Sequence, residues 1–182
     1  FLNAGPGYGG SCLPKDMKAL INFAKTTGIN PTLLNAVEEI NTKQLEQIIL
    51  MIKEKLGDLG TKKITILGTA FKPDTDDIRD SIAIELIKKL LKKKAKIIIH
   101  DPKAMKNTQR IFKEKINYAK TIKDALSKSE CVIIMTQWKQ YEKLNNNQFK
   151  YMTKKFVIDC RRMLVKKQLD VDYFAIGLGK KN

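Results

Sequence analysis

The sequence contains very little histidine, arginine or cysteine. Its 182 residues include one histidine, His100, so sites built from several histidines and Ser-His-Asp catalysis have little material. The three cysteines, Cys12, Cys131 and Cys160, form no CxxC pair and are odd in number. A metal cluster or a disulfide framework is therefore not predicted, and we expect a reducing, cytoplasmic location.

Long apolar runs are also absent. No run approaches the roughly 18 consecutive apolar residues that a membrane-spanning helix needs, so we expect no membrane partner. Residues 1–6 carry no initiator methionine, basic segment or apolar segment, and no signal peptide is predicted. Such a start is typical of the middle of a protein, and we expect the chain to be a piece of a longer one.

Positive charge is abundant and comes almost entirely from lysine. Lys and Arg total 35 against 19 acids, a net charge of +16, and the arginines are only Arg79, Arg110, Arg161 and Arg162. Such an excess favours polyanionic partners. A nucleic-acid surface usually clusters its charge, interleaves aromatic residues and uses arginine, whereas aromatics are only 7% of this chain. We therefore favour a solvated lysine-rich surface over nucleic-acid binding, and a small phosphate-bearing ligand is compatible with it.

The first part of the chain predicts a glycine-rich loop and two helices. Residues 1–14 form the loop, and apolar residues at helical spacing predict a helix over 16–25 that closes at Gly28. A second helix is predicted over 31–56, with a gap in its apolar pattern at residues 41 and 42. At about 1.5 Å per residue it spans nearly 40 Å. A helix of this length more often crosses between domains or subunits than serves one core.

Beyond residue 60 the pattern changes to short strands that alternate with helices. The predicted strands cover residues 63–67, 96–100, 116–119, 131–135 and 155–159. The predicted helical segments cover 81–92, 122–128 and 138–144, and a basic stretch follows the second strand. This alternation predicts an α/β fold, a Rossmann-like parallel sheet covered by helices. We therefore divide the chain into residues 1–57, the loop and connecting helices, and residues 58–182, the Rossmann-like domain.

The run from Gly5 to Gly10 matches G-x-G-x-x-G but lacks the context of a dinucleotide fingerprint. That fingerprint works between a strand and a helix, and no strand precedes this run. The glycines instead indicate a loop pressed closely against a ligand, and they also predict partial disorder. A better turn of this type ends at Gly68, and Asp101 lies where a ribose-binding acid would sit. Because the glycine pattern there is incomplete, we favour another nucleotide over NAD at that turn.

Cys12 lies in the glycine-rich loop, directly before the predicted first helix. A helix N-terminus and a nearby ammonium group both favour a thiolate over a thiol. Spacing alone leaves two interpretations open, a nucleophile or an incidental loop cysteine. Asp16, four residues further on, would lie one helical turn away and orient water or a proton. Cys131 and Cys160 are predicted to pack inside the sheet.

Two further segments reach the carboxyl edge of the predicted sheet, where open α/β folds bind ligands. The polar loop 71–81 follows the first strand and offers Lys72 and Arg79 as phosphate contacts, with a solvated, salt-bridged loop as the alternative. Arg161 and Arg162 follow a later strand, where one guanidinium would clamp a phosphate.

The sixteen residues FLNAGPGYGGSCLPKD, from Phe1 to Asp16, resemble the catalytic-cysteine loop of the UDP-glucose/GDP-mannose dehydrogenase family. The segments GTAFKP (68–73) and TDDIR (75–79) resemble a second family signature. HDP (100–102), TQW (136–138) and DCR (159–161) resemble further landmarks in the expected order. The resemblance covers essentially the whole chain and looks closer to the UDP-glucose branch, although Gln137 replaces an acid usual at that place.

The resemblance implies a two-step, NAD-dependent oxidation of a sugar C6 alcohol to a carboxylate. Cys12 would be the nucleophile, holding the aldehyde as a thiohemiacetal and then as a thioester, and Asp16 would assist the proton and water steps. Lys15 and Arg79 would contact the NAD. The UDP-sugar would be held by Phe1, Leu2, Asn3, Ala4, Gly5, Gly9, Phe71, Lys72 and Arg161.

The resemblance also implies missing partners. In this family an NAD-binding domain lies upstream, and the long helix is where such enzymes form dimers. We therefore expect the chain to bind a UDP-sugar but to be inactive by itself. A GDP-mannose 6-dehydrogenase is the second interpretation. A basic nucleotide- or RNA-binding module is the third, and its binding would fall steeply with salt.

Overall fold

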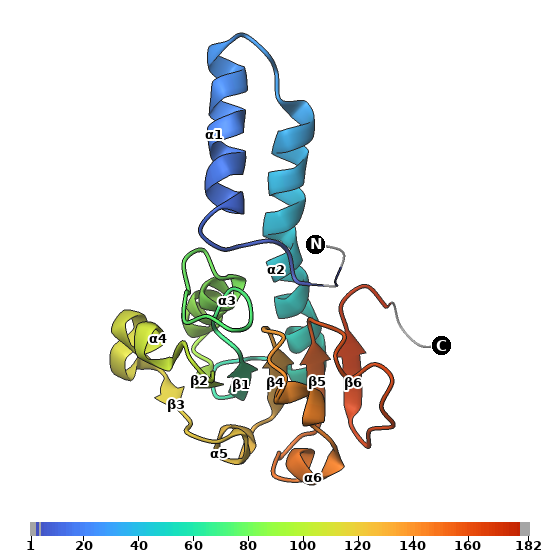
Figure 1. Ribbon diagram of the computed structural model, residues 1–182. Coiled ribbons are helices and arrows are strands. Elements are labelled where there is room, and N and C mark those ends of the chain that lie inside the picture. The colour runs from blue at the N-terminus through green and yellow to red at the C-terminus, as the bar shows by residue number, and fades with distance from the viewer. Residues whose placement is uncertain (1–2, 4, 179–182) are drawn as a thin grey trace.

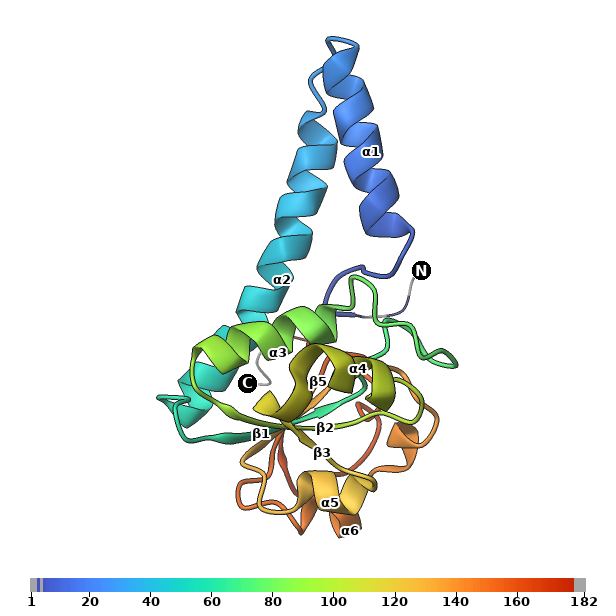
Figure 2. The same cartoon turned by 90° about the vertical axis from the view of Figure 1, so that its left-hand side faces the viewer.

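The amino-terminal part of the chain is a helical hairpin. The computed structural model describes residue 3 and residues 5–178. Helix α1 (Leu13–Thr26) begins with Pro14 in its first turn, where the missing N–H is tolerated, and α2 (Thr32–Leu56) begins directly after Pro31. Helix α1 and the amino-terminal half of α2 stand above the sheet, and the carboxyl-terminal half of α2 runs down to it (Figures 1 and 2). The two predicted helices are confirmed, and α1 starts three residues before the predicted first residue.

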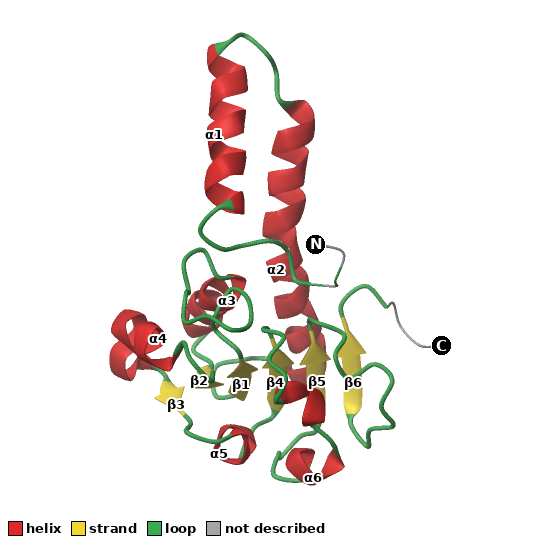
Figure 3. Ribbon diagram, viewed as in Figure 1, coloured by secondary structure: helices red, strands yellow, loops and turns green. Residues whose placement is uncertain are grey.

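The second part is a six-stranded sheet in which all paired strands are parallel. Its order is β3-β2-β1-β4-β5-β6, the order of a doubly wound Rossmann fold. The strands are β1 (Lys63–Leu67), β2 (Lys96–His100), β3 (Asn117–Tyr118), β4 (Cys131–Ile134), β5 (Phe156–Asp159) and β6 (Asp172–Ala175). The predicted Rossmann-like sheet covered by helices is thus confirmed, and Figure 3 shows α2 running from the hairpin down to it.

Alternating residues of the strands contribute to two apolar layers, one on each face of the sheet. On one face the carboxyl-terminal half of α2 packs with α3 (Ile82–Lys92) and α4 (Met105–Phe112) on alternate residues such as Ile64 and Ile133. The other face is covered by α5 (Ile122–Leu126), a short 3-10 turn (Tyr141–Lys143) and α6 (Asn146–Phe149). Figure 2 shows α3 and α4 on one side of the sheet and α5 and α6 on the other.

Four segments differ from the prediction. The basic stretch after β2 contains helix α4 and a 3-10 turn (Lys113–Lys115), because only Thr108 and Phe112 of α4 are buried and its apolar pattern is too sparse to read. The helix expected over 138–144 is only a 3-10 turn. Helix α6 and the edge strand β6 were not predicted, since β6 is short and only half-buried.

The hairpin contrasts with the sheet in its burial. Of α1 only Pro14 is buried, and the buried residues of α2 begin at Leu45, in the half that packs on the sheet. Several large apolar side chains of the hairpin are exposed, namely Leu13, Leu20, Phe23, Ile29, Leu33 and Ile40. Within the described ranges, no helix combines the length and apolar character that a membrane crossing requires.

Candidate active site

A cavity of about 470 Å³ lies where the glycine-rich loop meets the carboxyl edge of the sheet. One wall is the loop that leads into α1, and the opposite wall is formed by the segment after β1, the start of α3 and the residues after β4 and β5. The lining residues are Gly7, Tyr8, Gly9, Gly10, Ser11, Cys12, Leu13, Ala70, Phe71, Lys72, Ser81, Ile82, Ala83, Met135 and Arg161. The chain thus brings together segments about 150 residues apart at the edge where α/β sheets bind ligands.

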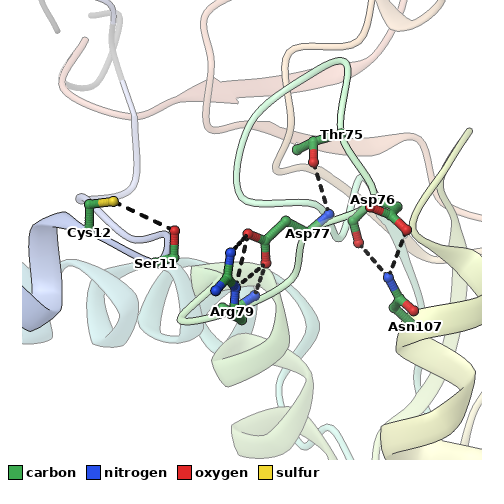
Figure 4. Close-up of polar contacts among 7 residues, drawn as sticks. All are labelled: Ser11, Cys12, Thr75, Asp76, Asp77, Arg79 and Asn107. Atoms are coloured by element: carbon green, nitrogen blue, oxygen red, sulfur yellow. Dashed lines mark hydrogen bonds and ion pairs between the residues drawn. The ribbon is translucent and has the colours of Figure 1, made fainter.

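Cys12 is the N-cap residue of α1 and its side chain is exposed. Its carbonyl accepts a hydrogen bond from the backbone N–H of Asp16 at 2.8 Å, the first bond of the helix. Its Sγ lies 3.7 Å from the Ser11 hydroxyl (Figure 4). Cys131 and Cys160 are buried in the sheet, and burial raises the pKa of both thiols. Cys12 is therefore the one accessible thiol among the described residues.

Two glycines allow the cysteine loop to touch the segment after β1. A Cβ on Gly9 would stand 2.3 Å from the backbone oxygen of Asp80, and a Cβ on Gly10 would stand 2.5 Å from the ring of Phe71. The Gly10 N–H donates to the same Asp80 oxygen at 3.3 Å. The ring therefore lies directly on the glycine backbone, and larger residues would push the two walls of the cavity apart.

Arg161 is held at the cavity by the backbone around it. Its N–H donates to Asp159 Oδ1 at 2.9 Å, and its Nε donates to the carbonyl of Met135 at 2.7 Å. The other oxygen of Asp159 accepts from the Leu164 N–H and the Tyr173 hydroxyl. Among the described residues, no carboxylate forms an ion pair with this guanidinium. Burial lowers the pKa of Arg161 from its usual value, yet a guanidinium stays charged at neutral pH.

Lys72 supplies a second positive charge at the cavity. Its ammonium lies 5.4 Å from the centre of the Phe71 ring, a cation–π arrangement that keeps the charge at the cavity mouth. Ser81, the N-cap residue of α3, also lines the cavity, together with the first two residues of that helix. The backbone N–H groups at such a helix start favour anions. One end of the cavity is therefore suited to a phosphate group.

Arg79 lies outside the cavity lining. Its Nε and Nη2 donate to both carboxylate oxygens of Asp77, the closest contact being 2.7 Å (Figure 4). This pairing raises the pKa of Arg79 and lowers the pKa of Asp77. The loop is fixed at two further points, where Thr75 accepts from the Asp77 N–H and Asn107 donates to Asp76. The alternative of a salt-bridged loop therefore describes Arg79 in this structure.

The predicted site residues fall into three groups. Gly9, Cys12, Phe71, Lys72 and Arg161 line the cavity, and Gly5 lies against Arg161, whose Nη1 would be 2.6 Å from a Cβ there. Outside the lining are Asn3, Lys15, Asp16 and Arg79, and Lys15 pairs with Asp16 at 3.4 Å. Phe1, Leu2 and Ala4 lie outside the described residues.

Sequence reasoning missed several lining residues. Three of them lie next to predicted site residues, namely Tyr8, Gly10 and Ser11. The family resemblance covers the whole loop and could have included them. Ser81 was identified only as a helix start, although an N-cap at the carboxyl edge of a sheet is itself a sign of an anion site. Met135 gave no sequence signal, because it contributes a backbone carbonyl.

Asp101, which lies where a ribose-binding acid would sit, has its hydrogen-bond partners within the protein. Its carboxylate is 3% exposed and accepts five hydrogen bonds, from four backbone N–H groups and the Trp138 indole. Gly68 has a φ of +92°, and a Cβ there would stand 2.4 Å from that of Thr136. The glycine thus serves packing within the sheet, and the described residues form no cradle for a dinucleotide at this turn. They also contain no group of three or more residues suited to a metal ion.

The described residues of the glycine-rich loop make hydrogen bonds to distant segments, and the partial disorder of the loop stays a prediction. Tyr8 is bonded to the side chain of Asn41 on α2, and Gly10 is bonded to Asp80. These contacts come from segments 33 and 70 residues away, which the composition of the loop does not reveal.

Fold and cavity together place the chain among the Rossmann-like α/β proteins that bind a ligand at the carboxyl edge of a parallel sheet. Residues 65–166 match the UDP-binding domain of the UDP-glucose/GDP-mannose dehydrogenase family, and residues 1–43 match the central domain of the same family. The chain therefore belongs to the UDP-glucose/GDP-mannose dehydrogenase family.

Individual relatives agree with this assignment. The chain is 40% identical to the UDP-glucose 6-dehydrogenase AglM of Haloferax volcanii, over 97% of this chain and 40% of the relative. It is 36% identical to a UDP-glucose 6-dehydrogenase of Rickettsia conorii, over 97% of this chain and 42% of the relative. A UDP-glucose dehydrogenase structure from Pyrobaculum islandicum superposes with a TM-score of 0.85 at 34% identity, covering 94% of this chain and 38% of that one. The chain thus spans about two fifths of the length of these relatives.

Proposed function

We propose that this chain is the nucleotide-sugar-binding and nucleophile-bearing part of a UDP-glucose 6-dehydrogenase, which converts UDP-glucose to UDP-glucuronate. The observation that carries the proposal is the guanidinium of Arg161, which has no carboxylate partner among the described residues and lines the same cavity as the Cys12 thiol. A cation without a carboxylate partner and a nucleophile in the lining of one cavity suit a ligand that carries both a diphosphate and a reactive carbon.

In this proposal the charged side of the cavity holds the diphosphate. Arg161 and Lys72 supply the positive charges, and the N-terminus of α3 supplies backbone donors. Gly9 and Gly5 would contact the UDP-sugar through their backbone groups, and Phe71 would pack beside it. We propose Phe1, Leu2, Asn3 and Ala4 as further UDP-sugar contacts, carried over from the family's cysteine loop.

Cys12 and Asp16 would carry the chemistry at the sugar. The Cys12 sulfur adds to the carbonyl carbon of the sugar aldehyde, and the carbonyl oxygen takes up a proton to give a thiohemiacetal. At the later thioester stage, water attacks the same carbon, and the carboxylate and the thiol of Cys12 are released. Asp16 would accept and return the proton of that water, which requires it to leave the exposed ion pair with Lys15.

In this proposal the complete protein also needs a cofactor, a further domain and a second subunit. We propose NAD as the hydride acceptor, with Lys15 and Arg79 as the contacts from this chain and a separate upstream domain as its cradle. We also propose a homodimer through α2, whose exposed apolar side chains are unpartnered among the described residues. Residues 1–57 and 58–182 would then act as connecting and UDP-sugar-binding parts.

Calorimetric titration with UDP-glucose at about 0.15 M salt tests the proposal. We expect UDP-glucose to bind in preference to GDP-mannose, and Arg161→Ala to weaken binding about 10- to 100-fold, because a charge-assisted hydrogen bond contributes about 1.5–3 kcal/mol. Arg110→Ala is the matched control, since Arg110 is exposed and lies away from the cavity.

Each other outcome decides between the alternatives. Preference for GDP-mannose would replace the substrate with that of the other branch of the family. Tight, strongly salt-dependent binding of an RNA oligomer with no response to either sugar would contradict the proposal and favour a basic nucleic-acid-binding module.

A further inference from the structure

One side chain of α2 holds the cysteine loop by two hydrogen bonds. The backbone N–H of Tyr8 donates to Asn41 Oδ1 at 2.8 Å, and Asn41 Nδ2 donates to the Tyr8 carbonyl at 3.1 Å. The amide therefore pairs with both polar groups of a single loop residue, as a neighbouring strand would. The two residues are 33 positions apart, so the loop gains this partner only when α2 is in place.

A second contact from α2 engages the same loop residue. The Tyr8 hydroxyl donates to Glu38, which lies one helical turn before Asn41. Burial and the Glu38 contact raise the pKa of Tyr8 to about 12, so the hydroxyl remains a proton donor at neutral pH. Both ends of Tyr8, its backbone and its phenol, are thus bound to one face of α2.

Gly7 is the residue that permits this close approach. Its φ is +115°, and a Cβ there would stand 2.4 Å from Asn41 Oδ1. Any larger residue would displace either the loop or the amide. The loop backbone is therefore fitted to Asn41 in particular.

The position of Asn41 along α2 makes it a rigid support. The buried part of α2 begins at Leu45, four residues further on, and continues through Ile48 and Ile49 into the core against the sheet. A continuous helix transmits the position of that anchored part to Asn41 one turn away. The gap in the apolar pattern at residue 41 thus marks a polar contact that faces the loop.

We propose that Asn41 is a positioning residue for Cys12: it fixes Tyr8 to α2, and so sets where the thiol, four residues further along the loop, stands relative to a ligand held by Arg161. The cysteine loop then has two anchors, Asn41 on α2 and Asp80 with Phe71 on the segment after β1. The identity of the ligand in this inference rests on the proposed function. The anchoring of the loop rests only on the contacts described above.

Selective alkylation of Cys12 measures this positioning. The chain is treated with free iodoacetamide and with an iodoacetamide linked to uridine diphosphate, and the ratio of the two rates reports how well the bound nucleotide presents the reagent to the thiol. Cys131 and Cys160 are buried, so Cys12 is the thiol that reacts. Cys12→Ser verifies the assignment.

We expect Asn41→Ala to lower the rate ratio about tenfold, which corresponds to about 1.4 kcal/mol, while the rate with free iodoacetamide changes little because Cys12 is already exposed. Gln44→Ala is the matched control, because Gln44 is a half-buried amide three residues further along the same helix. Glu38→Ala, which removes only the phenol contact, should have a smaller effect.

Hydrogen exchange separates the inference from the proposed function. Without ligand, Asn41→Ala should speed exchange at the Gly10 N–H about tenfold or more, although Gly10 is bonded to Asp80 and not to Asn41. Exchange in the β4 strand should stay unchanged. Unchanged exchange at Gly10, or a rate ratio equal to that of the unsubstituted chain, would overturn the role of Asn41. A ratio near one in the unsubstituted chain would instead overturn the proposed UDP-sugar site, and the exchange result would still decide the role of Asn41.

Discussion

The sheet and the helical hairpin differ in how far their apolar side chains are buried. Every residue of β4 is buried, and the helices on both faces of the sheet complete two apolar layers. In the hairpin, Phe23 is 64% exposed and Leu33 is 75% exposed, and Pro14 is the only buried residue of α1. The sheet region therefore carries its own stability, whereas the hairpin presents an apolar surface of the kind that marks an interface.

Helix α2 belongs to both regions, and its two halves show the difference within one element. Its carboxyl-terminal half is built into the core through Leu45, Ile48, Ile49, Ile52 and Leu56. Its amino-terminal half contributes exposed Leu33 and Ile40, together with the polar contacts to Tyr8. The candidate active site lies at the junction, so its geometry depends on one region with a buried apolar core and on another whose apolar side chains are largely exposed.

The largest test of this comparison is truncation of one apolar side chain in each region. Ile87→Ala in α3 removes a side chain that is 0% exposed and should lower the free energy of unfolding by about 2–5 kcal/mol. Leu33→Ala should change it by no more than about 0.5 kcal/mol, because little apolar area is buried there. Urea unfolding measures both. Equal losses would show that the hairpin is packed against a partner in solution.

A pair of glycines sharpens the comparison. Both Gly68 and Gly28 have a positive φ, but a Cβ on Gly68 would collide with Thr136, whereas a Cβ on Gly28 would meet no atom within 4 Å. Gly68→Ala should therefore cost about 3 kcal/mol or more, the sum of backbone strain and overpacking, and Gly28→Ala about 1 kcal/mol from backbone strain alone. Thermal unfolding of the two variants distinguishes these values, and a cost at Gly28 as large as that at Gly68 would contradict the open surroundings of the hairpin tip.

The smallest expected effect is a pH dependence of the unfolding free energy, caused by a histidine of the sheet. Burial lowers the pKa of His100 from its ordinary value of 6.5, so the unfolded chain takes up a proton at a pH where the folded chain does not. Stability should thus be complete above about pH 7 and fall as the pH drops below 6.5, by at most about 1.4 kcal/mol per pH unit until the folded form is protonated as well.

The single histidine makes this slope easy to assign. His100→Gln should flatten the unfolding free energy between pH 7 and 5, as measured by urea unfolding at several pH values. Helix α1 contains no histidine. Where its amides exchange through local opening and not through global unfolding, the free energy of that opening should not show the same pH dependence. A slope that persists in the variant would contradict the assignment.

Much of the fold could be predicted because the strongest elements have unambiguous patterns. The strands at 63–67 and 96–100 are continuous β-branched and apolar runs, and α3 has one apolar face. Elements held by tertiary contacts alone were missed. Strand β6 is half-buried at the sheet edge. The helix predicted from Trp138 does not form, and the indole of Trp138 donates a hydrogen bond to Asp101.

The candidate site was predictable where a residue type itself carries the chemistry. Cys12, Lys72 and Arg161 were candidates from their types and places, the family resemblance then favoured their roles, and all three line the cavity. The structural role of Asp101 was not predicted, because nothing local shows that five donors already occupy its carboxylate. Asn41 was noticed only as a gap in an apolar pattern, since its partner lies 33 residues away.

The wide separation of the cavity residues along the chain has a consequence for synthesis on the ribosome. Phe71 and Arg161, which share the cavity of Cys12, follow it in the chain by about 60 and about 150 residues. At 5–20 residues per second, the interval before Arg161 is added is roughly 7–30 s. During that interval the thiol belongs to a growing chain whose cavity is still incomplete. The cavity around Cys12 is therefore completed only late in the synthesis of the chain.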